Sequence, residues 1–127
     1  MKIKLTRVYV DDQNNALKFY TEVLGFAKKK DLPFEKFRLL TLVSPEEPEG
    51  PELLLEPSNN PITKTFQKAL YKQGIPLTAF AVENLQYEYE RMKNLGVKFQ
   101  TKPTMKGDAI VAVFDDTCGN LIQLYQV

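Results

Sequence analysis

The chain has 127 residues, of which 43% are hydrophobic and 26% charged, values that suit a single globular domain of ordinary composition. Its net charge of +1 argues against non-specific electrostatic binding of nucleic acid. The sequence has no histidine, which excludes Ser-His-Asp and Cys-His catalysis, zinc sites built on imidazole and HExxH enzymes. A single cysteine excludes an intrachain disulfide and a CxxC redox pair.

The N-terminal residues show no pattern typical of a targeting signal, because Asp11 and Asp12 interrupt the chain before an apolar segment could form. The longest uninterrupted apolar run, Ala109 to Phe114, has six residues and is far too short to span a bilayer. We therefore expect a cytoplasmic protein that binds neither membranes nor nucleic acid. The unpaired Cys118 is compatible with a reducing compartment.

The first half of the chain predicts one strand, one helix and three further strands. Residues 3–10 are β-branched and apolar with polar interruptions, which indicates a strand. Asp12 can cap the helix that follows, and Gly25 ends it. The apolar residues of this helix fall on one face: Ala16, Phe19, Tyr20, Val23 and Leu24. The three further strands are expected at residues 26–31, 36–43 and 52–56, with an exposed loop rich in proline and glutamate before the last one.

A connector follows at residues 58–76, where the apolar spacing predicts a short amphipathic helix ending before Gly74. The second half then repeats the order of the first. Residues 77–82 predict a strand, and a helix ends at Gly96. Three more strands are expected at residues 97–102, 109–114 and 120–126.

Three landmarks support an internal repeat. Val10 and Val82 lie 72 positions apart, and Gly25 and Gly96 lie 71 positions apart. Gly50 and Gly119 lie 69 positions apart. This nearly constant spacing indicates two βαβββ modules, one in each half of the chain.

Two segments resemble the vicinal oxygen chelate superfamily, which includes glyoxalase I, extradiol dioxygenases and bleomycin-resistance proteins. Residues 8–26, VYVDDQNNALKFYTEVLGF, are similar to the opening strand and helix of that family. Residues 113–126, VFDDTCGNLIQLYQ, are similar to its closing strand. Residues 78–97 resemble the opening of a second module, so that the likeness covers essentially the whole chain.

The resemblance implies an α+β fold with two tandem βαβββ modules that form an incomplete, curved barrel around a concave pocket. It places module one at about 1–57, the connector helix at about 58–76 and module two at about 77–127, within a single domain 1–127. It also implies a homodimer, because family members often pair. Whether modules pair within one chain or are exchanged between two chains stays open.

Family members that use a metal ion take its ligands from four strand positions. Aligning the two modules with the family pattern places these positions at Leu5, Leu54, Leu77 and Gln123. Leucine offers no lone pair to a cation, and one glutamine cannot hold a divalent ion alone. We therefore expect no metal and no cofactor, and the metal-dependent activities of the family are not carried over to this chain.

Strand alternation extends these four positions to a set of residues that we expect to line the ligand pocket. The set comprises Leu5, Arg7, Tyr9, Glu52, Leu54, Glu56, Leu77, Ala79, Gln123 and Tyr125. Such a mixture of apolar and polar groups is typical of small-molecule sites. The opposite strand faces are expected to pack under the helices.

Each polar residue of this set has a structural alternative to a role in binding. Arg7 could anchor an anionic ligand, or it could pair with Glu52 or Glu56. Those two glutamates could act as acid and base, or they could lie at a solvated strand end. The tyrosines could be core residues, and Gln123 could be a remnant of the metal site or a hydrogen-bonding group for a ligand.

Three functions remain open at this point. The first is a metal-independent protein that binds an unidentified small molecule, as bleomycin-resistance proteins do. Bleomycin itself is disfavoured, because it is cationic and this chain lacks strong acidity. The second is an enzyme of the lyase, isomerase or dioxygenase type in the same superfamily. The third is a dimeric accessory domain whose pocket is filled by side chains, and no residue identifies a catalytic centre.

Overall fold

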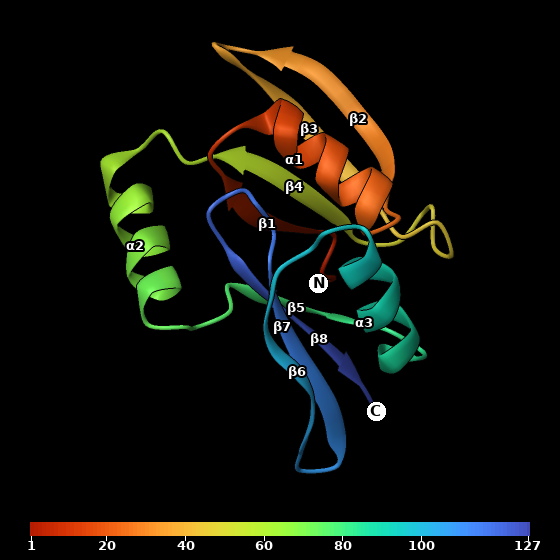
Figure 1. The fold of residues 1–127 in the computed structure, drawn as a ribbon. Helices are drawn as coiled ribbons and strands as arrows, with labels where there is room; N and C mark the ends of the chain where they lie inside the picture. The colour runs from red at the N-terminus through yellow and green to blue at the C-terminus, as the bar shows by residue number, and fades with distance from the viewer. The chain divides into compact units, whose positions relative to one another are not determined.

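Each half of the chain forms its own four-stranded sheet in the computed structural model, which describes residues 1–127 (Figure 1). The chain divides into two units, Met1–Lys64 and Thr65–Val127. The strand order is β1-β4-β3-β2 in the first unit and β5-β8-β7-β6 in the second. The predicted α+β fold with two tandem modules is therefore confirmed, and neither sheet closes on itself. The assignment of both units to one domain stays a prediction.

In the first unit, β1 runs parallel to β4, and the β2–β3 hairpin completes the sheet through antiparallel pairs. Strands β1, β3 and β4 carry the buried residues of this sheet, among them Val8, Leu42 and Leu55. The helix packs across this buried face, as Figure 1 shows. The elements are β1 (Leu5–Val10), α1 (Gln13–Lys18), η1 (Phe19–Val23), β2 (Ala27–Phe34), β3 (Phe37–Val43) and β4 (Glu52–Pro57).

The first helix differs from the predicted regular helix, because its second half, η1, is π-helical. The backbone N–H of Leu24 donates to the carbonyl of Phe19, five residues back. This wider turn keeps Phe19 and Tyr20 buried. Periodicity at 3.6 residues cannot predict such a turn, because it changes the hydrogen bonding and leaves the apolar order unchanged.

Strands β2 and β6 extend past the predicted ends at residues 31 and 102. Each continues through a proline, Pro33 in β2 and Pro103 in β6. Proline removes a backbone donor and is therefore confined to sheet edges. Both strands lie at the edge of their sheets. The proline breaks the sequence pattern, but an edge strand needs no donor on its outer side.

The second unit repeats the arrangement, with β5 parallel to β8 and a β6–β7 hairpin. Helix α3 packs on β6, β7 and β8, and its Leu85 and Met92 are buried there. Gly96 ends α3 with a φ of 90°, as Gly25 ends the first helix with a φ of 86°. The elements are β5 (Thr78–Ala81), α3 (Leu85–Asn94), β6 (Phe99–Lys106), β7 (Ala109–Asp115) and β8 (Leu121–Gln126).

Helix α2 (Pro61–Lys72) occupies the predicted connector and carries the chain from the first unit into the second. Gln67 is its buried residue, whereas Ile62 and Phe66 are exposed. None of the helices has the length and apolar character that a membrane crossing requires.

Candidate functional site

The predicted pocket residues of the first unit share one face of its sheet. The register pairs Leu5 with Glu52, Arg7 with Leu54, and Tyr9 with Glu56. Their strand neighbours point the other way and are buried under the helix, among them Val8 and Leu55. We refer to the face that carries Leu5, Arg7 and Tyr9 as the helix-free face of the first sheet. The predicted alternation is confirmed here, and the role of these residues in a pocket stays a prediction.

The helix-free face continues onto the β2–β3 hairpin, which the sequence analysis left out of the site. Lys30 pairs with Thr41, Leu32 with Leu39, and Phe34 with Phe37 across the hairpin. Phe34 is 62% exposed and Phe37 is 39% exposed. Strand β2 was expected to end at residue 31, before Leu32 and Phe34, whereas Phe37 lies within the strand expected at residues 36–43. The signal that could have found them is the short polar pair between two phenylalanines, Glu35 and Lys36, which forms the hairpin turn.

Arg7 forms an ion pair with Glu56 on this face, with 2.9 Å between the guanidinium nitrogen and the carboxylate oxygen. About half of the Arg7 side chain is exposed. Arg7 lies on β1, which is an edge strand of its sheet. Of the two alternatives for Arg7, pairing with a glutamate is therefore observed.

Glu52 is held in place by two neighbours on the same face. The Thr41 hydroxyl donates to its carboxylate at 2.7 Å, and the ammonium group of Lys30 lies 3.6 Å away. The hydrogen bond from Thr41 lowers the pKa of Glu52 below its usual range, and the nearby lysines lower it further. A general base at neutral pH needs the opposite shift, so this carboxylate is poorly suited to acid–base catalysis.

A hollow of about 580 Å³ opens between the β2–β3 hairpin and the end of β4. Leu54 and Glu56 of the predicted set line it, together with residues that the sequence analysis did not identify. Its volume is within the range of sites for drug-sized molecules. The complete lining is Phe34, Glu35, Lys36, Phe37, Arg38, Leu39, Leu54, Leu55, Glu56, Pro57 and Asn59.

The predicted residues of the second unit also lie on one sheet face. Ala79 pairs with Gln123 and Ala81 with Tyr125, while the backbone N–H of Leu77 donates to the Leu121 carbonyl. Gln123 and Tyr125 are half-buried, and Ala79 is exposed. The opposite face carries the buried Ile122 and Leu124. The strand alternation predicted for this unit is therefore confirmed as well.

The donor groups of these faces do not fit the metal ion that some family members use. The aligned positions carry three leucines and Gln123, and leucine offers no ligand atom. Nowhere in residues 1–127 do three or more His, Cys, Asp or Glu side chains gather in a group that could hold a metal ion. No step that depends on a metal is therefore derived for this chain.

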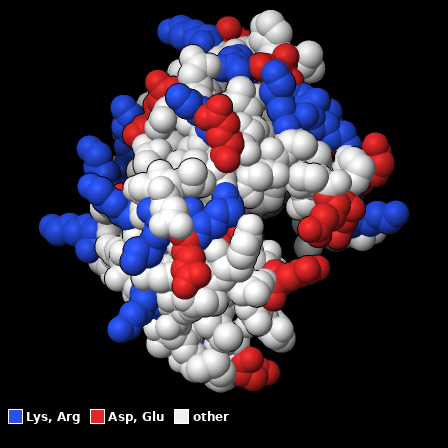
Figure 2. All heavy atoms as spheres, turned by 45° about the vertical axis from the view of Figure 1, so that its right-hand side comes forward, with Lys and Arg blue, Asp and Glu red and all other residues white.

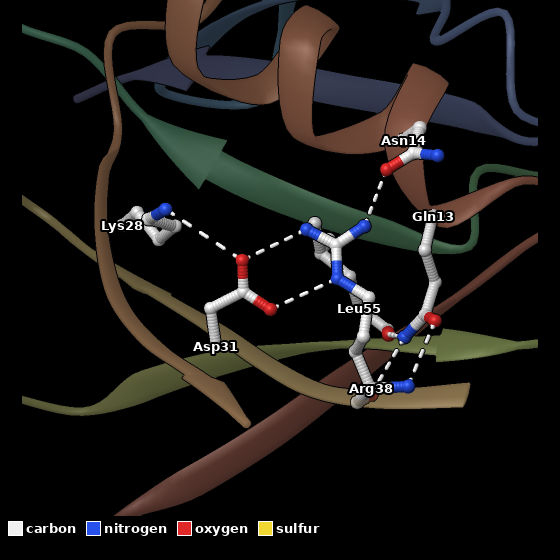
Figure 3. Close-up of polar contacts among 6 residues, drawn as sticks. All are labelled: Gln13, Asn14, Lys28, Asp31, Arg38 and Leu55. Atoms are coloured by element: carbon white, nitrogen blue, oxygen red, sulfur yellow. Dashed lines mark hydrogen bonds and ion pairs between the residues drawn. The ribbon is translucent and has the colours of Figure 1, made fainter. Parts of the chain in front are cut away.

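A polar cluster on the other face fixes the hairpin to the helix (Figure 3). The Gln13 amide donates to the carbonyls of Arg38 and Leu55, at 2.8 and 3.0 Å, and accepts the backbone N–H of Arg38. The Arg38 guanidinium binds both carboxylate oxygens of Asp31, at 2.9 Å each, and also donates to Asn14. These contacts lower the pKa of Asp31 and raise that of Arg38. The cluster thus positions the hairpin that borders the hollow.

In the second unit, a buried network holds the turn between β7 and β8. Gln67 donates to the Cys118 carbonyl and to the Asn120 side chain, at 3.0 and 2.9 Å. Asp116 accepts the backbone N–H groups of Cys118 and Asn120. Cys118 is fully buried in this turn.

Comparison with known proteins identifies relatives along the whole chain. The uncharacterized protein YurT of Bacillus subtilis (strain 168) is 55% identical over 126 residues, which cover 99% of each chain. The crystal structure of UcmS2 superimposes with a TM-score of 0.84 at 32% identity and covers 98% of this chain and 97% of that one. TnmS3, an antibiotic binding protein from Streptomyces sp. CB03234, gives a TM-score of 0.78 at 25% identity, covering 99% and 95%.

The βαβββ topology occurs once in each unit, and this repeated topology defines a protein of the glyoxalase fold. Residues 2–124 match the family model of the Glyoxalase/Bleomycin resistance protein/Dioxygenase superfamily. The chain belongs to this superfamily, as the resemblance of its opening and closing segments predicted.

Proposed function

We propose that this protein binds a small organic molecule without a metal ion and without catalysing its conversion. The observation that carries the proposal is the donor set at the four aligned positions, where three leucines and one glutamine replace metal ligands. A member of this superfamily that lacks these ligands keeps a concave scaffold and loses the Lewis acid. Binding is the function that such a scaffold retains.

Two further observations support binding over catalysis. The first is that neither candidate base is suited to its task, because Glu56 is paired with Arg7 and the pKa of Glu52 is lowered by Thr41. The second is the similarity to TnmS3, a protein described as antibiotic binding. We propose a ligand of comparable kind for this chain, that is, an organic compound of drug-like size.

The test is a thermal-shift screen of the purified protein with two arms. One arm holds the chlorides of Mn, Ni, Co and Zn, and the other holds small acids, thiol conjugates and antibiotics. A ligand that binds only the folded state raises the melting temperature. The proposal expects shifts in the organic arm only. A shift with micromolar metal that a chelator reverses, or silence in the organic arm, would contradict it.

For the assembly we propose a homodimer, which the family resemblance supports. Sedimentation velocity at several protein concentrations measures the mass directly. A monomer at all concentrations would contradict the proposed dimer and would leave the proposed binding function untouched.

A further inference from the structure

We infer that the hollow beside the β2–β3 hairpin is the binding site and that it takes an uncharged aromatic molecule. This inference rests on the proposed function and adds two things to it, a place in the first unit and a class of ligand. Three features of the hollow support it: the apolar lining, the balance of its charges and the volume of about 580 Å³.

The apolar lining offers aromatic and flat aliphatic surface. Phe34 and Phe37 face each other across the hairpin, and Leu39, Leu54 and Pro57 extend the same surface. Phe34 remains 62% exposed, although a phenylalanine side chain gains free energy from leaving water. Aromatic rings stack on such surfaces with a gain beyond area burial alone. The lining therefore favours a ligand with at least one aromatic ring system.

Two of the four charged groups of the lining are paired with residues outside it. Glu56 is paired with Arg7, and the Arg38 guanidinium is bound to Asp31. The remaining two, Glu35 and Lys36, carry opposite charges and are exposed at the hairpin turn. The four charges of the lining sum to zero, because Glu35 and Glu56 offset Lys36 and Arg38.

A charged ligand would therefore lose water in this hollow and would meet a counter-charge only at the exposed turn, where Glu35 and Lys36 stand next to each other with opposite charges. The only amide of the lining, Asn59, lies exposed at its edge and suits a carbonyl or hydroxyl substituent of a neutral ring. Figure 2 shows blue and red side chains spread over the visible face and separated by broad white areas, in keeping with the net charge of +1.

The experiment compares matched probes that differ in charge and share a ring system. N-phenyl-1-naphthylamine is neutral, and 1-anilinonaphthalene-8-sulfonate is the same molecule with an anionic group. Acridine is neutral at slightly alkaline pH, and 9-aminoacridine is cationic. Fluorescence titration of the full chain gives a Kd for each, and circular dichroism confirms that every sample is folded. We expect the neutral member of each pair to bind at least about tenfold more tightly.

Variants place the probe in the hollow. Phe34→Ala and Phe37→Ala are expected to weaken binding of the neutral probes by about five- to tenfold, because each removes a ring from the lining. Met105→Ala is the matched control, since Met105 is 63% exposed and lies on β6 in the second unit. This control is expected to leave the Kd unchanged.

Two further variants test the charge argument with side chains of which a third or more is exposed, so that folding is expected to survive. Glu56→Gln leaves Arg7 without its carboxylate, and the preference for the neutral probe over the sulfonate is expected to fall by about three- to tenfold. Arg7→Met leaves Glu56 without its guanidinium, and the preference over 9-aminoacridine is expected to fall in the same way.

The outcomes separate this inference from the proposed function. Equal or tighter binding of a charged probe would overturn the inference of a neutral ligand and would still show a binding protein. Neutral probes that bind without sensitivity to Phe34 or Phe37, or that do not bind, would overturn the site in the hollow. The proposed function itself is tested separately by the thermal-shift screen, through silence in its organic arm or a metal shift that a chelator reverses.

Discussion

In the first unit, a buried glutamine connects the helix to the sheet by hydrogen bonds. In the second unit, a buried glutamine instead forms hydrogen bonds to the turn between two strands. Gln13 reaches from α1 to the backbone of β3 and β4, and Gln67 reaches from α2 to the turn before β8. Both side chains are more than nine-tenths buried. The strand orders of the two units are the same, yet the polar contacts that secure them differ in position and in partner.

This difference separates two contributions to the structure of each unit. One is the spacing of apolar residues along the chain, and the other is the hydrogen bonding of single buried polar side chains. The apolar pattern repeats between the halves and produces the same topology twice. The buried amides of Gln13 and Gln67 do not occupy equivalent positions, because each forms hydrogen bonds to buried backbone groups that are specific to its own unit. The first unit is therefore expected to depend on the contact between helix and hairpin, and the second on its β7–β8 turn.

The largest effect is expected at Gly119 in the second unit. Its φ of 99° strains any side chain, and an added Cβ would lie 2.7 Å from the amide nitrogen of Gln67. Gly119→Ala is therefore expected to lower the free energy of unfolding by about 2–4 kcal/mol, from backbone strain and a disturbed amide. Urea denaturation measures this loss.

Gly96→Ala is the matched control, because Gly96 has a φ of 90° and open space around it. Only the strain of about 1–2 kcal/mol is expected there. If the two variants lose the same stability, the contact with Gln67 does not hold the turn.

The next largest effect is expected at Gln13 in the first unit. Gln13→Ala would leave the Leu55 carbonyl and the Arg38 N–H without their partner, at an expected loss of about 2 kcal/mol. Gln86→Ala, at an exposed position of α3, is the control and is expected to stay within about 0.5 kcal/mol. Faster hydrogen exchange confined to β2 and β3 in Gln13→Ala would show that the hairpin is what the amide holds. Unchanged exchange there would argue against this role.

A smaller effect, which depends on pH, is expected for Asp31 in the first unit. Arg38 lowers the pKa of the folded-state carboxyl below its usual value of about 4. Its contribution to stability is thus complete above that value and is lost as the pH falls through the lowered pKa. Urea unfolding of the protein and of Asp31→Asn should therefore give stabilities that differ at neutral pH and converge in acid. A difference that persists in strong acid would rule out the ion pair as its source.

The smallest effect is expected at Tyr71 in the second unit, and it has the opposite pH dependence. The Tyr71 hydroxyl donates to Asp115 at 2.6 Å, which raises the pKa of the phenol above its usual value of about 10. The stability that this contact contributes is complete below that value and is lost as the pH rises through the raised pKa. Tyr71→Phe is expected to cost about 0.5 kcal/mol at neutral pH, because the pair is exposed. A loss that does not diminish in alkali would contradict the assignment.

Much of the candidate site followed from strand alternation, and part of it did not. Leu54 and Glu56 were predicted and line the hollow, because a period of two fixes which residues share a face. Phe34 was missed because Pro33 ends the strand pattern before it, and Phe37, although it lies in the strand expected at residues 36–43, was not included in the pocket set. The bond between Arg7 and Glu56 was one of several open alternatives, because alternation gives the face of a residue and leaves its partner on the next strand undetermined.

The sequence by itself determined the two βαβββ modules and the apolar face of the helix in each module. These features depend on local spacing and residue type, which are properties of the linear chain. The tertiary structure decided where each edge strand ends, that the first helix closes with a π-helical turn, and which backbone groups Gln13 and Gln67 satisfy. These features depend on which segments meet in space. A proline is tolerated in a strand only at the edge of a sheet. A buried amide stabilises the fold only where backbone groups have no other hydrogen-bonding partner.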